Sequence, residues 1–128
     1  MPLITVHGIP NEEHWEDFKH VVGYRLVQAV IEIRQLGFCA ADFVVEYPPP
    51  LREEYQGPAP TKIIILVEHL FERPDTSKQR EKMVKHVAKK LVAVVIRSNT
   101  APTICIVRAP HPYDIFHSSY DSFRLLGE

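Results

Sequence analysis

The residue with the clearest chemical potential is Pro2, which follows Met1 and precedes the apolar run Leu3–Val6. Removal of Met1 would turn the Pro2 nitrogen into a secondary amine at the start of a strand. An α-amino group has a pKa of roughly 7.7–8.0, and burial lowers this pKa because it disfavours the charged form. Such an amine can act as a general base or a nucleophile at neutral pH. A proline at the start of a strand can also be purely structural.

Other reactive side chains lack the spacing that their chemistry requires. None of the 7 histidines stands at a metal-ligand spacing from a cysteine or a second histidine. His7 falls on the opposite face of its strand from Pro2. No Gly-x-Ser-x-Gly elbow is present for a serine nucleophile. We therefore expect no metal site and no bound cofactor.

The composition indicates one domain without a polyanionic partner. The 128 residues include 15 basic and 16 acidic side chains and carry a net charge of −1, which gives no basic surface for nucleic acid or an anionic membrane. Cys39 and Cys105 lie in or beside apolar runs, which is typical of reduced, buried thiols and favours a cytoplasmic location. No segment reaches about 18 uninterrupted apolar residues, and no export signal follows Met1, so we expect neither export nor membrane insertion.

The chain contains two copies of one pattern. The segment Val22–Ile31 is echoed by Val87–Ile96, with Val, Leu, Val, Val and Ile at one constant offset. In both stretches apolar residues recur every three or four positions, which predicts two amphipathic helices.

Capping signals predict where these helices begin and end. Asn11 is a good N-cap for the first helix, and Gly37 should close it. The segment Thr76–Gln79 has the form of a capping box for the second helix, which should stop near Asn99.

An apolar strand is predicted before and after each helix. The four strands are expected at Leu3–His7, Asp42–Tyr47, Lys62–Phe71 and Thr103–Arg108. A proline-rich connector, residues 48–60, joins the first copy (2–47) to the second (61–108), and a C-terminal arm covers 109–128. The sequence therefore predicts a single α+β domain of tandem βαβ repeats, in the order β-α-β-β-α-β.

The handedness of crossover connections constrains how these elements are arranged. Each βαβ unit should be right-handed with parallel strands, so that both helices cover one face of a four-stranded sheet. The second strand pair is so rich in Ile and Val that both of its faces need burial. Because the helices leave one face bare, we expect a homo-oligomer.

Two further motifs accompany the Met1-Pro2 start and the repeat. Glu72-Arg73-Pro74-Asp75 forms the turn between an apolar strand and the second helix, and Ala101-Pro102-Thr103 leads into the last strand. Over nearly its whole length the chain resembles the tautomerase superfamily, whose members include 4-oxalocrotonate tautomerase and macrophage migration inhibitory factor. The two copies of the pattern correspond to the two-repeat form of that superfamily. The resemblance implies a homotrimer in which the Pro2 amine is catalytic. It also implies that Arg73, which matches the family's turn arginine, holds a substrate carboxylate.

The chain lacks two other arginines of the family pattern. The positions of these arginines fall near Cys105 and at Leu70 in this sequence. Arg108, at the end of the last strand, or Arg25, on the first helix, could supply the missing charge. A site with Arg73 alone would bind a dicarboxylate weakly.

Aromatic residues near the strand ends are further candidates. Tyr113 and Tyr47 lie at strand ends, where the family places helper residues, and we count Tyr113 among the substrate-binding candidates. The tail could form a short helix, but Pro110 and Pro112 favour a hairpin or an extended arm. Its aromatic side chains are expected to anchor a neighbouring subunit or to line a pocket; they are Tyr113, Phe116, Tyr120 and Phe123.

The expected function is keto–enol proton transfer on a small carbonyl or carboxylate substrate, with Pro2 as general base and Arg73 stabilising the enolate. Decarboxylation or hydration of a small acid is the neighbouring reaction class, and it would require a cationic Pro2. A different class also remains open. The same element order builds ferredoxin-like binding modules, in which the strands of the two units interleave, and a tautomerase fold can be catalytically silent.

Overall fold

The computed structural model describes residues 2–10, 12–48, 62–70, 78–98, 103–110 and 115–121. Its strands are β1 (Leu3–His7), β2 (Val44–Glu46), β3 (Ile63–Glu68), β4 (Thr103–Pro110) and β5 (Ile115–Asp121), and its helices are α1 (Glu16–Ile31) and α2 (Lys78–Ser98). Short 3-10 turns occur at Glu13–Trp15, Arg34–Leu36 and Ala40–Asp42. Within these residues no helix is long and apolar enough to cross a membrane.

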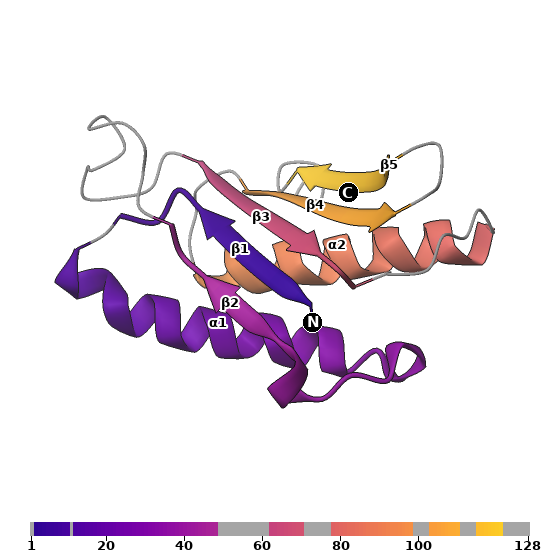
Figure 1. Ribbon diagram of the computed structural model, residues 1–128. Coiled ribbons are helices and arrows are strands. Elements are labelled where there is room, and N and C mark those ends of the chain that lie inside the picture. The colour runs from indigo at the N-terminus through magenta and orange to yellow at the C-terminus, as the bar shows by residue number, and fades with distance from the viewer. Residues whose placement is uncertain are drawn as a thin grey trace.

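The sheet has the order β2-β1-β3-β4-β5 (Figure 1). β1 pairs with β2 in parallel, and β3 pairs with β4 in parallel, while β1 and β3 are antiparallel. The two strands of each βαβ unit are therefore direct neighbours, as predicted. This pairing confirms the α+β repeat architecture and excludes the ferredoxin-like alternative, in which the two units interleave.

The C-terminal segment adds a fifth strand to the four that were predicted. β5 pairs antiparallel with β4 from Ile104↔Asp121 to Pro110↔Ile115. The tail thus forms a hairpin, one of the two forms expected for it, rather than a short helix. Of its four aromatic residues, Phe116 and Tyr120 lie on β5, whereas Tyr113 and Phe123 lie outside the described residues.

Both helices cover one face of the sheet (Figure 1). Alternate residues of β3 and β4 are fully buried beneath them: Ile63, Ile65 and Val67, then Thr103, Cys105 and Val107. The helices contribute apolar residues at a spacing of three or four, namely Val22, Leu26 and Val30 from α1 and Val84, Val87, Leu91 and Val95 from α2. The repeated pairs Val22/Val87, Leu26/Leu91 and Val30/Val95 are therefore core positions.

Two predicted boundaries in the first unit are wrong. α1 ends at Ile31, and the backbone leaves helical geometry at Ile33 (ψ 87°), so Gly37 (φ 72°) closes the following 3-10 turn instead. The strand expected at Asp42–Tyr47 is shorter because Asp42 belongs to another 3-10 turn. Its carboxylate there accepts a 2.8 Å hydrogen bond from the Cys39 N–H.

The remaining boundary predictions have mixed outcomes. Asn11 does not cap the first helix, because Glu12 precedes the 3-10 turn and Trp15 is the N-cap of α1. The second helix ends at Ser98, next to the predicted stop at Asn99. Thr76 of the predicted capping box lies outside the described residues, as does most of the connector. Both cysteines are free thiols. Cys105 is buried as predicted, but Cys39 is exposed because it begins a surface turn.

Candidate functional site

Pro2 is buried and lies immediately before β1. Its carbonyl oxygen accepts a 3.1 Å hydrogen bond from the Val44 N–H, which holds the start of β1 against the start of β2. The nitrogen carries no N–H within the chain, so no ladder hydrogen bond is lost at this position. The fold therefore fixes the backbone of Pro2 without using its nitrogen.

The strand register brings one charged pair to the same end of the sheet. Leu3, next to Pro2, is paired with Glu68 at the end of β3. The parallel pairing of β3 with β4 continues through Val67↔Val107, so the next residues along, Glu68 and Arg108, are neighbours. Arg108 Nη1 lies 3.6 Å from Glu68 Oε2. We call this group, Pro2 with Glu68 and Arg108, the Pro2 end of the sheet.

The pairing leaves Arg108 able to bind a ligand. The Arg108 side chain is 51% exposed, and a separation of 3.6 Å is an ion pair rather than a hydrogen bond. A guanidinium has five N–H donors in a planar fork. Arg108 can therefore accept the bidentate approach of a carboxylate while Glu68 limits how far the guanidinium moves.

The chain leaves β3 at this end with an unusual backbone conformation. His69 has φ 64°, in the left-handed region that few residues other than glycine adopt. Leu70 follows and is buried, whereas His69 is exposed. Neither the Glu68–Arg108 pair nor the turn at His69 was predicted, although Glu68 directly follows the apolar residues of β3 and Arg108 directly follows those of β4.

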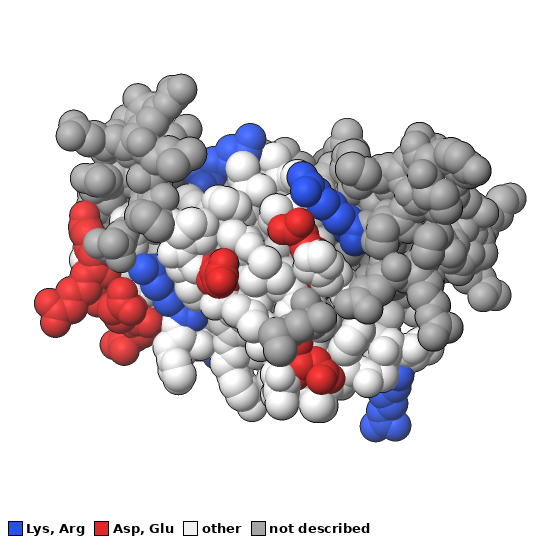
Figure 2. Space-filling model, in the orientation of Figure 1, with Lys and Arg blue, Asp and Glu red and all other residues white. Residues whose placement is uncertain are grey.

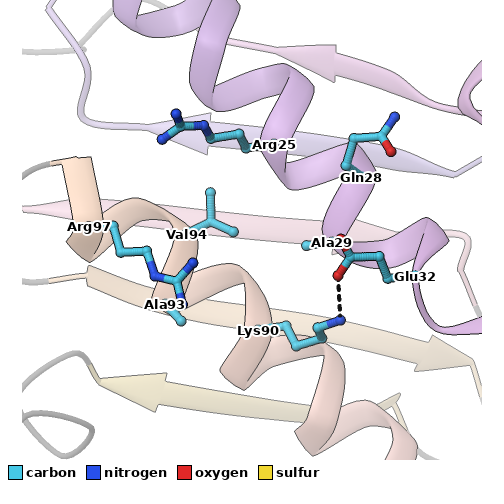
Figure 3. Close-up of a pocket in the computed structure, with 8 residues that line it drawn as sticks. All are labelled: Arg25, Gln28, Ala29, Glu32, Lys90, Ala93, Val94 and Arg97. Atoms are coloured by element: carbon cyan, nitrogen blue, oxygen red, sulfur yellow. Dashed lines mark hydrogen bonds and ion pairs between the residues drawn. The ribbon is translucent and has the colours of Figure 1, made fainter.

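The other candidates have different outcomes. Arg73 and Tyr113 lie outside the described residues. Arg25 does not join the Pro2 end, because it lines a groove between α1 and α2 (Figure 3). The core separates this groove from the sheet, so Arg25 lies away from the Pro2 end.

Tyr47 lies at the opposite end of the sheet. It follows β2, which runs parallel to β1 away from Pro2. Its hydroxyl donates a 2.7 Å hydrogen bond to the Lys19 carbonyl oxygen of α1. Burial raises the pKa of Tyr47 to about 12, although a backbone hydrogen bond at Gly23 opposes the shift. The role of Tyr47 is therefore to join β2 to α1.

The face of the sheet opposite the helices carries few charged side chains (Figure 2). Alternation places on it the apolar side chains of Leu3, Ile64, Leu66, Ile104 and Ile106, with Thr5 among them and Glu46 on the β2 side. These apolar side chains are partly buried by their neighbours, and Glu68 and Arg108 stand at one margin. The bare apolar face predicted from the sequence is present. The described residues contain no cluster of three or more side chains able to hold a metal ion.

Comparison with known proteins gives one structural likeness. No family model matches the chain, and no curated protein matches it. The fold is similar to that of a solved structure described as "R7 fused 4-OT wild type asymmetric trimer", with a TM-score of 0.50 and 17% sequence identity. The match covers 98% of this chain and 99% of the other, so the similarity extends over both βαβ units.

The Tyr47 contact predicts a measurable loss of stability. Tyr47→Phe should lower the free energy of unfolding by about 1 kcal/mol, because the hydrogen bond to Lys19 is lost, whereas Tyr24→Phe, at a site 65% exposed, should change it little. Urea denaturation measures both. Since the folded state favours the neutral phenol, the Tyr47 contribution is present below pH 10 and is lost as the pH rises through about 12. A phenolate absorbance difference between wild type and Tyr47→Phe that titrates near pH 10 would contradict this assignment.

Proposed function

Because the chain has the fold of the tautomerase superfamily in its two-repeat form, we propose that it is a tautomerase-type isomerase with the Pro2 amine as its general base. The observation that carries the proposal is the placement of a buried Pro2 at the end of the sheet that also holds Arg108. The substrate class is a small carbonyl compound with a carboxylate. Removal of Met1 is required, because an amide nitrogen has no basic lone pair.

The chemistry needs the Pro2 nitrogen in its neutral form. An α-amino group titrates near neutrality in water, so a substantial fraction of it is neutral at physiological pH. The amine takes a proton from the carbon beside the substrate carbonyl, and the electron pair moves onto the carbonyl oxygen to form an enolate. Pro2, now cationic, returns the proton to another atom of the substrate. Both transfers are general acid–base steps.

An arginine at the Pro2 end supplies a positive charge that stabilises the negatively charged enolate. Arg108 stands two strands from β1 with donors to spare. Arg73 is proposed beside it, because Leu70 is at the same end of the sheet only three residues earlier in the chain. One guanidinium would orient the carboxylate and the other would stabilise the developing oxyanion. Tyr113 is proposed as a further substrate contact.

Self-association as a homotrimer is part of the proposal. The similar solved structure is itself described as a trimer. In this chain the apolar sheet face is left open by the helices and spans the central strands β1, β3 and β4 (Figure 2). Burying such a face between subunits removes apolar area from water.

The amine predicts a strong effect of Pro2. In protein whose intact mass shows that Met1 is absent, Pro2→Ala should lower kcat/KM for phenylenolpyruvate by at least about 100-fold, the usual contribution of a positioned general base. An alanine amine is more mobile than the proline ring nitrogen. A second variant with one residue retained before Pro2 should be inactive, because it converts the nitrogen into an amide. Equal measurable rates for wild type and both variants would overturn Pro2 as the base, and absence of turnover in wild type would indicate a catalytically silent fold.

The Glu68–Arg108 geometry predicts a separate effect on substrate binding. Arg108→Gln should lower kcat/KM by about tenfold or more, since it removes charge-assisted hydrogen bonds worth about 1.5–3 kcal/mol. The matched control is Arg25→Gln, which removes the same charge from the helix layer and should leave kcat/KM unchanged. Steady-state kinetics over a range of substrate concentrations provides the measurement. An equal loss in both variants would show that only the overall charge matters.

The open face predicts how the oligomer can be dissociated. Leu66→Lys introduces a charge at the centre of this face and should convert the oligomer to monomers, measured by light scattering after size exclusion. Val21→Lys, at an exposed site on α1, should leave the oligomer intact. An oligomer that survives Leu66→Lys would rule out the sheet face as the interface.

A further inference from the structure

A groove runs along the seam between α1 and α2 on the side that faces away from the sheet (Figure 3). Its volume is about 570 Å³, which is within the range of roughly 300–1,000 Å³ typical of small-molecule sites. The small side chains of Ala29 and Ala93, together with Val94, line its middle. Charged side chains stand at both of its ends.

The sequence repeat makes the two ends of this groove equivalent positions. The offset that aligns Val22 with Val87 also aligns Arg25 with Lys90 and Glu32 with Arg97. Because the helices pack antiparallel, position 32 faces position 90, and position 25 faces position 97 (Figure 3). A faithful duplication would therefore place a basic residue opposite an acidic residue at each end.

Only one end keeps that pairing. Lys90 Nζ lies 3.0 Å from Glu32 Oε2. At the other end the acidic position is occupied by Arg97, so the two charged residues that line this end, Arg25 on α1 and Arg97 on α2, are both arginines (Figure 3). Both arginines are exposed, and neither makes an ion pair with a residue that the structure describes. Two facing cations repel each other, and an anion held between them would replace that repulsion with two attractions.

We propose that the Arg25–Arg97 end of the groove binds a phosphate group carried by a small organic molecule. Two guanidinium forks from opposite sides can each chelate phosphate oxygens, a geometry that arginine provides better than lysine. A bare phosphate would leave most of the groove empty. The organic part lies over Ala29, Ala93 and Val94, which gives the site its apolar contact. This site is independent of the proposed proline chemistry because it lies on the other layer of the fold.

The test is a titration of the full chain with phenyl phosphate and with inorganic phosphate at constant ionic strength, followed by calorimetry and by backbone amide shifts. Wild type should bind phenyl phosphate more tightly than inorganic phosphate, with shifts along the groove. Arg97→Glu should weaken binding at least about tenfold, because it removes one charge-assisted contact and restores an ion pair with Arg25. Arg34→Glu makes the same charge change on an exposed 3-10 turn outside the groove and should bind like wild type.

A second readout separates the site from a general charge effect. Without phosphate, Arg97→Glu should raise the melting temperature, because it replaces a repulsion with an ion pair, while Arg34→Glu should not. The proposal is overturned if wild type binds neither phosphate compound or if Arg97→Glu binds as tightly as wild type. Inorganic phosphate binding as tightly as phenyl phosphate would overturn the organic part of the proposal. Turnover of phenylenolpyruvate should be the same in Arg97→Glu as in wild type, so the two proposals fail independently.

Discussion

The antiparallel pairing of β1 with β3 is the constraint on which the rest of the structure depends. It joins the two βαβ units into one sheet, and its register, Leu3↔Glu68 through His7↔Ile64, determines which residues meet at each end. Because β3 and β4 are parallel, the same register brings Arg108 to the end of the sheet at which β1 starts. It also makes α1 and α2 antiparallel, which sets positions 25 and 97 opposite each other. A shift of one residue would move the apolar residues of β1 to the other face.

The fold could be predicted from the sequence because its main elements are repeated and strongly periodic. Each apolar strand is followed by a helix with a clear apolar face, and the right-handed crossover then fixes the parallel pairs. Local turn chemistry was harder to predict. Gly37 was a plausible helix end, but the backbone had already left the helix at Ile33. β5 was missed as a strand because its serines and flanking prolines give a weak pattern, whereas pairing with β4 supplies its hydrogen bonds.

The candidate site was predictable only in part, for a physical reason. Pro2 is identified by its position alone, but its neighbours depend on the register between strands that are far apart in sequence. Glu68 and Arg108 are 40 residues apart in the sequence, and each follows an apolar run. Nothing in the local sequence of either residue indicates that the other is its ion-pair partner. Arg25 was an equally reasonable candidate until the two layers were known. The charge of an arginine does not show whether it lies on a helix surface or at a strand end. Only the topology of the fold distinguishes these two locations.

The proposed catalytic atom differs from a side-chain base in how it is held. A histidine or glutamate must lose rotamer freedom to be positioned, at an entropic cost that packing must offset. The Pro2 nitrogen belongs to the backbone and to a ring, and the hydrogen bond from Val44 to the Pro2 carbonyl already fixes that backbone. Only the strand need be ordered for the amine to be in place. The chemistry of the Pro2 end therefore requires no additional ordering beyond folding of the sheet, whereas the guanidinium of Arg108 is steadied by Glu68.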